Sequence, residues 1–335
     1  MKYIVTGGAG FIGCHLINLL LENIDNTVVN IDKLTYASNE RSSNDFEKNS
    51  NYSLHKVDIV DYHSIKKIIN NFKPDAIFHL AAESHVDNSI EMPLEFIKTN
   101  VLGTSVMIEA ANQYWLKLEE SKKNKFRFLH VSTDEVYGSL KNKEYFTEET
   151  KYDPSSPYSA SKAGSDHLVR AWNRTYGLPT LITNCSNNFG PYQHPEKLIP
   201  KIIINALNNE LIPIYGNGQN ERDWLYVEDH VEALCHVIDK GKIGETYNIG
   251  SDNQRTNIDI TYIICNMLDK KLNTSEYNLD SFSQLITYVE DRPGHDQRYA
   301  IDPRKIQNEL KWRSKYNFDS YLESTIDWYI KNYGK

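Results

Sequence analysis

Cysteine is scarce in this sequence and follows no metal-binding or redox spacing. The 335 residues include four cysteines, Cys14, Cys185, Cys235 and Cys265, and no two of them form a Cys-x-x-Cys pair. Disulfide frameworks and zinc sites both require paired, closely spaced ligands. We therefore expect core thiols in a reducing compartment, with no disulfide scaffold and no metal site.

Positive charge is also in deficit, and long apolar runs are missing. Lys and Arg number 37 against 45 Asp and Glu, which gives a net charge of −8. Nucleic acids and anionic membrane surfaces select proteins with a basic face, and a membrane-spanning helix needs about 20 consecutive apolar residues. We expect neither a nucleic-acid nor a membrane partner. Since Met1 leads directly into a strand, we also expect no signal peptide and a cytoplasmic protein.

Strand-like and helix-like segments alternate six times in the first half of the chain. Such alternation is typical of α/β proteins with a parallel sheet. We predict a Rossmann-like, doubly wound parallel sheet with a smaller C-terminal substrate-binding lobe. The sheet domain is expected at 1–188, with 225–250 returning to it. The smaller lobe is expected at 189–224 and 251–335.

A glycine-rich loop joins the first strand to the first helix. Gly7, Gly10 and Gly13 are three residues apart, a spacing that permits a tight turn, close approach of a pyrophosphate and close helix–strand packing. Asp32 ends the second strand, where a carboxylate binds the adenosine ribose hydroxyls and repels a 2′-phosphate. The pattern predicts NAD as the cofactor, in preference to NADP.

Hydroxyl and carboxyl side chains follow a later buried strand. Thr133, Asp134 and Glu135 stand at its end, and Tyr158 and Lys162 are four residues apart in a predicted helix, so that they share one face. A Lys ammonium beside a phenol favours the phenolate and makes a general base. An Asp-Glu pair is ordinarily a solvated turn, and its position between a buried strand and the Tyr-Lys pair favours an active site instead.

These motifs together resemble the extended short-chain dehydrogenase/reductase family. The resemblance rests on the N-terminal Thr-Gly-Gly-Ala-Gly-Phe-Ile-Gly, on Ala81-Ala82 and on Tyr158-x-x-x-Lys162. Within the family, the segments at 80–87, 132–138, 195–200, 222–230 and 291–296 resemble the nucleotide-sugar 4,6-dehydratases, and most closely those that act on dTDP-glucose. Phe189 is a small departure, because the family usually has Tyr before this Gly-Pro.

The resemblance implies a lyase that converts dTDP-glucose to dTDP-4-keto-6-deoxyglucose and water. Tyr158, assisted by Lys162, would take the proton of the sugar 4-hydroxyl while hydride leaves C4 for NAD. Thr133 would hydrogen-bond the same oxygen. Glu135 would remove the C5 proton, and protonated Asp134 would release the 6-hydroxyl as water. Hydride would then return to C6, which leaves NAD unchanged overall.

The resemblance also implies two sets of binding residues. Cofactor contacts are expected from Gly7, Gly10, Phe11, Ile12, Gly13, Asp32, Lys33, Leu34, Thr35, Asp58, Ile59, Leu80, Ala81, Ala82, Ser84, Thr99, Tyr158, Lys162 and Asn188. Substrate contacts are expected from Ser84, Thr133, Asn187, Lys197, Leu198, Pro213, Tyr215, Arg222, Asn257, Arg292 and His295. Arg222 and Lys197 are the expected diphosphate ligands, since Arg forks onto phosphate oxygens.

A homodimer is a further implication of the resemblance. Helices beginning near Thr99 and Tyr158 would pair with those of a second copy in a four-helix bundle. The apolar residues expected there are Val101, Met107, Ile108, Leu168 and Trp172.

Three alternatives remain open at this point. A UDP-glucose 4,6-dehydratase is one, because the two nucleotides differ by a methyl group worth ~1–3 kcal/mol in an apolar pocket. A nucleotide-sugar 4-epimerase or decarboxylase of the same fold would use Tyr158 and NAD without needing both acids. A non-catalytic NAD-binding regulator is the most remote.

Overall fold

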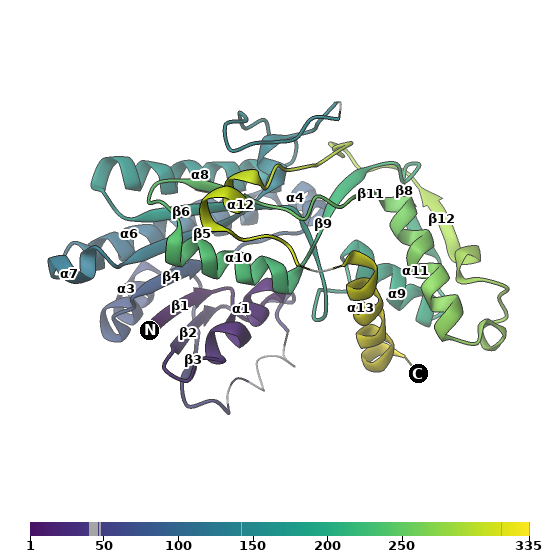
Figure 1. Ribbon diagram of the computed structural model, residues 1–335, viewed down its shortest axis with the longest axis horizontal. Helices are drawn as coiled ribbons and strands as arrows, with labels where there is room; N and C mark the ends of the chain where they lie inside the picture. The colour runs from purple at the N-terminus through teal and green to yellow at the C-terminus, as the bar shows by residue number, and fades with distance from the viewer. Residues whose placement is uncertain (40–45, 47, 142, 316, 335) are drawn as a thin grey trace.

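A parallel sheet forms the larger half of the protein. The computed structural model describes residues 1–39, 46, 48–141, 143–315 and 317–334. Within them lies a seven-stranded sheet of order β10-β6-β5-β4-β1-β2-β3, in which every neighbouring pair is parallel (Figure 1). Its strands are β1 (Lys2–Thr6), β2 (Thr27–Asp32), β3 (Tyr52–Lys56), β4 (Ala76–His79), β5 (Arg127–Thr133), β6 (Thr180–Cys185) and β10 (Thr246–Ile249). The predicted fold class is confirmed.

Two layers of helices cover the sheet. Helices α1 (Phe11–Leu21), α10 (Val227–Lys240) and α12 (Arg304–Leu310) share one apolar core, and α3 (Tyr62–Phe72), α6 (Thr104–Trp115) and α8 (Pro157–Tyr176) share another. Strand β1 contributes Tyr3 and Val5 to the first core and Ile4 to the second. Since successive strand residues point to opposite faces, the two cores lie on opposite sides of the sheet. A sheet covered on both faces needs strands with no polar face, and every residue of β4 and β6 is buried.

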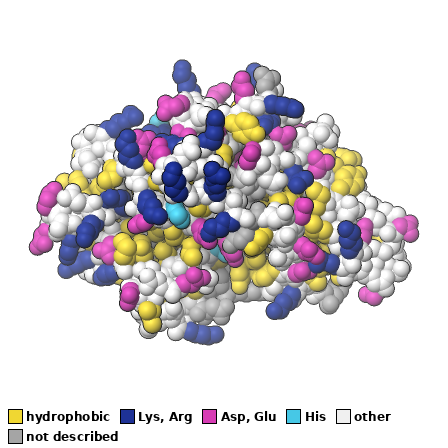
Figure 2. Space-filling view, viewed as in Figure 1, with side chains coloured by type: hydrophobic (Ala, Val, Ile, Leu, Met, Phe, Trp, Pro, Cys, Tyr) yellow, Lys and Arg dark blue, Asp and Glu magenta, His cyan; other side chains and the backbone are white. Residues whose placement is uncertain are grey.

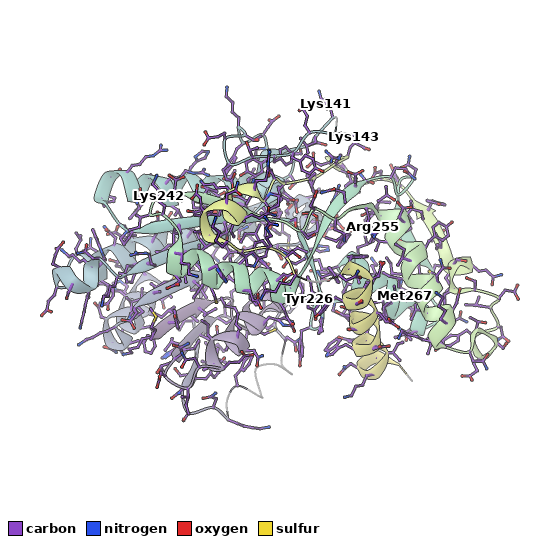
Figure 3. The ribbon with its side chains drawn as sticks, in the orientation of Figure 1. Lys141, Lys143, Tyr226, Lys242, Arg255 and Met267 are labelled. Carbon is purple, nitrogen blue, oxygen red and sulfur yellow. The ribbon has the colours of Figure 1, made fainter. Side chains whose placement is uncertain are left out.

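A second, smaller group of elements lies beside the sheet, on the right in Figure 1. It contains a sheet of order β11-β9-β7 and a pair, β12-β8. The strands are β7 (Asn187–Phe189), β8 (Ile212–Tyr215), β9 (Glu221–Tyr226), β11 (Gln254–Thr256) and β12 (Ile286–Val289), and α9 (Leu198–Leu207), α11 (Asn257–Lys271) and α13 (Phe318–Tyr333) pack over a core of their own. Tyr226 lies between α10 and α13, where its ring centroid is 4.4 Å from that of Tyr321 (Figure 3).

One predicted helix is divided in the structure. The sequence predicts a continuous helix from Thr99 to about Leu118, and the protein has a π-helix, η1 (Ile97–Gly103), followed by α6. Asn100 in this π-helix bonds both backbone groups of Glu83 and the Ser161 hydroxyl. Gly103 is packed so closely that a Cβ would lie 2.5 Å from Ile59 Cδ1. Such irregular turns occur frequently at functional sites.

Helix α8 has strong start and stop signals. Ser156 accepts a hydrogen bond from the Ser159 backbone, while the Ser159 hydroxyl accepts one from the Ser156 backbone, which is a capping box. Pro157 occupies the first turn, and Gly177 ends the helix in the left-handed conformation with φ 76°. The first turn of α8 therefore holds Tyr158 in a defined position.

The remaining elements are short. They are α4 (Val86–Glu91), α5 (Pro93–Phe96), α7 (Glu120–Lys123), η2 (Asp134–Tyr137), η3 (Thr274–Tyr277) and η4 (Phe282–Leu285). On the face shown in Figure 2, basic and acidic side chains are intermixed. Among the described helices, none has the length and apolar character needed to cross a membrane.

Candidate active site

A cavity of about 310 Å³ lies at the carboxyl ends of β1, β2, β4 and β5. In doubly wound sheets this edge is where ligands bind, beside the point where the strand order reverses. The sheet order places that point between β1 and β4. The cavity brings together many of the predicted residues: Gly7, Gly10, Phe11, Ile12, Gly13, Asp32, Lys33, Thr35, Ile59, Leu80, Ala81, Ala82, Ser84, Thr99, Thr133, Asp134, Glu135, Tyr158, Lys162, Asn187, Asn188 and Lys197.

The glycine loop is packed tightly against its neighbours. Gly7 has φ +71°, and a Cβ on it would lie 2.8 Å from the Ala81 backbone. A Cβ on Gly13 would lie 2.2 Å from the Gly7 carbonyl oxygen. These contacts explain why glycine occupies both positions, and they bring the loop beside the Ala81-Ala82 segment. The first helix therefore begins at the floor of the cavity, as a pyrophosphate site requires.

Asp32, the last residue of β2, lies beside the glycine loop. Its carboxylate accepts hydrogen bonds from the Ala9 and Leu34 backbone amides at 3.0 and 2.8 Å. Burial raises its pKa, and those two bonds and the nearby Lys33 oppose that shift. Leu34 does not line the cavity, and neither does Asp58, whose side chain accepts from the Val60 amide.

The two adjacent carboxyls are in different environments. Asp134 is 2% exposed, and its Oδ2 atom has no hydrogen-bond partner among the described residues. Burial raises its pKa well above the ordinary value, with Glu135 and Asp223 adding to the effect. Burial also raises the pKa of Glu135, and Arg292, Arg222 and Lys197 all oppose that shift. The environment thus favours a protonated Asp134 beside a Glu135 that is more readily ionised.

The Tyr158–Lys162 pair differs from the expectation. Tyr158 and Lys162 are both buried in α8, and the Lys162 ammonium donates to the Val131 carbonyl oxygen at 2.8 Å. Burial raises the pKa of Tyr158 well above its ordinary value, and the charge of Glu135 raises it further, while a hydrogen bond with Thr133 opposes this. The expected lowering of the Tyr158 pKa by Lys162 is therefore wrong for this geometry, because desolvation is the larger effect.

Arg222, a predicted phosphate ligand, does not line the cavity but is held close to its acids. It lies with its guanidinium 4.2 Å above the Tyr299 ring and donates to the Asp296 carbonyl oxygen at 2.9 Å. The Tyr299 hydroxyl in turn donates to the Asp296 carboxylate at 2.5 Å. Sequence reasoning missed both supporting residues. The only available signal was the segment 291–296, which includes Asp296.

A second group of predicted substrate residues converges on Asp87 in α4. Arg292 Nη1 lies 3.3 Å from its Oδ1 atom, and the Tyr215 hydroxyl donates to Oδ2 at 3.2 Å. His295 is bound instead to Asp291, with 2.6 Å between Nδ1 and Oδ1. The two contacts with Asp87 join the smaller lobe to the sheet domain.

The other predicted substrate residues are spread over three elements. Leu198 begins α9, Pro213 lies in β8 and Asn257 begins α11, and none of these three lines the cavity. Lys197 lines it and donates to the Ser84 carbonyl oxygen at 2.9 Å. Asn187 has a buried side-chain oxygen without a hydrogen-bond partner among the described residues.

Several cavity residues were not predicted. Glu83 pairs with Lys33 at 3.2 Å across the cavity, and Ser186, Gln193, His194 and Glu196 also line it. Glu83 directly follows the predicted Ala81-Ala82 segment, so its position was a usable signal. The described residues include no cluster of three or more His, Cys, Asp or Glu side chains able to hold a metal ion.

Comparison with known proteins identifies the class. The model of the GDP-mannose 4,6 dehydratase family matches residues 4–325. The chain therefore belongs to this family of extended short-chain dehydrogenases/reductases, and the predicted resemblance is confirmed.

The similar individual proteins are more specific. A dTDP-glucose 4,6-dehydratase from Escherichia coli is 54% identical over 99% of this chain and 94% of its own length. A crystal structure of the Bacillus anthracis dTDP-glucose 4,6-dehydratase in complex with NAD is 40% identical, with a TM-score of 0.87 over 99% of this chain and 97% of that one. A UDP-glucose 4-epimerase from Thermotoga maritima is 27% identical, with a TM-score of 0.84 over 99% of both chains.

Replacing Asp134 with an uncharged residue should stabilise the folded protein. The folded protein holds its proton above the pH at which the unfolded chain releases it, so the wild type loses stability as the pH rises from the unfolded pKa towards the folded one. Asp134→Asn should therefore raise the free energy of unfolding by about 1 kcal/mol at about pH 8 and by nearly nothing at about pH 4. Urea denaturation at both pH values measures this.

The matched control is Asp229→Asn. Asp229 is also fully buried, but its carboxylate accepts from the Ser314 hydroxyl and the Lys315 amide. This variant should lose stability at neutral pH. A loss of stability in both variants at about pH 8 would contradict the prediction.

Proposed function

We propose that this chain is an NAD-dependent hydro-lyase that converts dTDP-glucose to dTDP-4-keto-6-deoxyglucose and water. One observation carries the proposal: Asp134 and Glu135, adjacent in sequence, lie in the same cavity as the glycine loop and Tyr158, and burial raises the pKa of both, strongly at Asp134 and against three opposing cations at Glu135. An elimination needs such an acid and base side by side. The full-length likeness to dTDP-glucose 4,6-dehydratases supports the choice of reaction.

NAD is the cofactor of this reaction. The close packing of Gly7 and Gly13 leaves room for a pyrophosphate at the start of α1, and the Asp32 carboxylate lies where a ribose would be held. Bound NAD supplies the hydride acceptor for oxidation at C4 and the hydride donor for reduction at C6. Lys33 and Glu83, paired across the cavity, would close over the cofactor.

Tyr158 is the proposed base for the sugar 4-hydroxyl. Its pKa is raised in the absence of substrate, so it is protonated there. Lys162, four residues further along α8, is the proposed cation that would help it release the proton. Thr133, which interacts with the Tyr158 hydroxyl, would bond the same sugar oxygen. The buried position of all three excludes water from the reacting centre.

Glu135 and Asp134 are the proposed base and acid of the elimination. The ketone at C4 acidifies the C5 proton, which the Glu135 carboxylate removes. Asp134 gives its proton to the departing 6-hydroxyl, and water leaves. Glu135 then returns its proton to C5, which restores Glu135. Asp134 regains a proton from solvent, to which Tyr158 releases the proton taken from the 4-hydroxyl, so that all three groups return to their starting state.

The nucleotide diphosphate is assigned to Arg222 and Lys197, with Pro213 and Tyr215 beside the base. The proposed division of labour places NAD binding at 1–188 and 225–250 and sugar-nucleotide binding at 189–224 and 251–335. The choice of dTDP over UDP follows the relatives. We also propose a cytoplasmic location, since four free cysteines without paired spacing are typical of a reducing compartment.

A homodimer is proposed through η1, α6 and α8. Of the residues expected at its interface, Met107 and Ile108 are fully buried in the protein's own core, so they cannot serve there. Leu102 is 52% exposed on η1, and Ile97 of the same element is 46% exposed. These side chains, with half-buried Val101, Leu168 and Trp172, offer the apolar surface that a second copy would cover.

The direct test is turnover of dTDP-glucose and UDP-glucose, measured side by side by mass spectrometry. We expect dTDP-glucose to lose one water with no net change in NAD, and UDP-glucose to react more slowly by roughly tenfold, as a missing methyl group predicts. A product of unchanged mass would indicate an epimerase, and faster turnover of UDP-glucose would reassign the nucleotide.

Glu135→Gln separates the oxidation from the elimination. The variant retains Tyr158 and Lys162, so it should still oxidise C4 and accumulate reduced cofactor, while overall turnover falls by about 10²–10⁴-fold. Absorbance of the reduced cofactor and deuterium exchange at C5 measure the two effects. Asp134→Asn is the matched control and should retain C5 exchange without releasing water. Full turnover by either variant would contradict the role proposed for the residue that it replaces.

Leu102→Glu tests the dimer. A charged side chain at the centre of an apolar interface should leave the protein monomeric in sedimentation analysis, whereas the wild type sediments as a dimer. Leu211→Glu is the control, because Leu211 is 62% exposed before β8 and far from η1 in the chain. Dimers in both variants would place the interface elsewhere.

A further inference from the structure

The buried face of α8 continues beyond the Tyr158–Lys162 pair. Asp166 and Arg170 follow at the same four-residue spacing, so the four side chains share one side of the helix. Asp166 is fully buried, with no exposed surface. It has no part in the reaction steps described above. A carboxylate buried so completely is costly unless charge and hydrogen bonds compensate it.

The Asp166 carboxylate is held by hydroxyl groups from two other segments. Its Oδ2 atom accepts from the Ser132 hydroxyl of β5 at 3.0 Å and from the Tyr152 hydroxyl at 2.8 Å. Arg170 Nη2 lies 2.7 Å from the same Tyr152 oxygen. Burial would raise the pKa of Asp166, but the contact with His130, followed by the positive charges of Lys162 and Arg170, holds it below its ordinary value.

The neighbouring histidines and thiol carry no charge that could balance Asp166. His130 Nε2 lies 3.2 Å from Asp166 Oδ1, and burial lowers the pKa of His130 to about 4. His79, stacked on His130 with ring centroids 5.4 Å apart, has its pKa lowered well below the ordinary value by burial. Burial raises the pKa of Cys185 to about 12. The balancing cations around Asp166 are therefore Lys162 and Arg170.

Lys162 and Asp166 are both anchored to β5. Lys162 donates to the Val131 carbonyl oxygen, and Asp166 accepts from the hydroxyl of the next residue, Ser132. Along α8, Lys162 stands one helical turn after Tyr158 and one turn before Asp166. Burial lowers the pKa of Lys162, and Asp166 is the main group that opposes this.

We propose that Asp166 is a positioning residue for catalysis: its buried carboxylate keeps Lys162 charged, so that Tyr158, and not Lys162, is the group that releases a proton. The inference rests on the proposed function only for the identity of the reaction. Two isomeric forms of the deprotonated pair exist, phenolate with ammonium and phenol with amine. Because Asp166 is one turn from Lys162 and two turns from Tyr158, its charge favours the first form, which is the one able to act as a base.

The direct measurement is an NMR titration of the Lys162 side chain in protein without substrate, assigned with the variant Lys162→Met. Asp166→Asn should lower the pKa of Lys162, since a nearby negative charge has been removed. This readout does not depend on turnover. A Lys162 pKa that is unchanged in the folded variant would overturn the proposal, whatever reaction the enzyme catalyses.

The kinetic measurement is reduction of bound cofactor on mixing with dTDP-glucose, as a function of pH. Asp166→Asn should reduce the limiting rate by about tenfold or more at every pH, with KM for the substrate little changed, because the active form is depleted at all pH values. Asp229→Asn is the control for loss of a buried carboxylate elsewhere and should keep the wild-type rate. If the wild type itself fails to react, the proposed function fails, and the titration above still decides the role of Asp166.

A double-mutant cycle separates positioning from general structural support. In the background of Lys162→Met, Asp166→Asn should reduce the rate of cofactor reduction almost no further, since the group through which Asp166 acts is gone. An equal reduction of the rate in both backgrounds would show that Asp166 has a structural role only. If Asp166→Asn does not fold, Arg170→Gln takes its place. Removing the Arg170 charge should shift the acidic side of the profile of cofactor-reduction rate against pH to higher pH. An unshifted profile would overturn the proposal.

Discussion

The cost of burying charge governs the carboxyl end of β5. Burial is the largest influence on the pKa of Asp134, Glu135, Tyr158 and Lys162 alike, raising it for the two acids and the phenol and lowering it for the ammonium. In water each group would have its ordinary charge and none would serve as both acid and base near neutral pH. The surrounding structure acts by compensating this cost selectively, with cations beside Glu135 and a carboxylate behind Lys162.

The parallel sheet explains why these groups meet. Its register pairs Ser132 with Asn184 and Thr133 with Cys185, so the end of β5 is fixed against β6, and the Asn184 side chain donates to the Thr133 carbonyl oxygen. The acids follow at once in η2, while α8 returns across the same edge with Tyr158 in its first turn. The sheet alone does not supply the cations. Arg222 comes from β9 in the smaller lobe, which makes the site a product of both lobes.

Local pattern was sufficient for much of this arrangement. The glycine spacing, the acid at the end of β2 and the Tyr-x-x-x-Lys pair predicted residues that the structure brings together in one cavity, because each motif depends on short-range geometry. The pKa of Tyr158 was misjudged because desolvation depends on everything packed around the ring, which no four-residue spacing reveals. Met107 and Ile108 were misassigned to a dimer interface because periodicity shows that a face is apolar and does not show what covers it. The support of Arg222 by Asp296 and Tyr299 joins segments more than 70 residues apart, and Asp87 reaches Arg292 over 205 residues.

The division between Asp134 and Glu135 has a consequence for substrate binding. The three cations that oppose the rise in the Glu135 pKa, Arg292, Arg222 and Lys197, include both of the proposed diphosphate ligands. A diphosphate bound there would neutralise part of their charge and so weaken their hold on the Glu135 carboxylate. The pKa of Glu135 would rise on binding, which makes it a stronger base when a sugar is in place to react. Asp134, influenced by a single one of these cations, would keep its proton throughout, so the same binding event leaves the acid unchanged and strengthens the base.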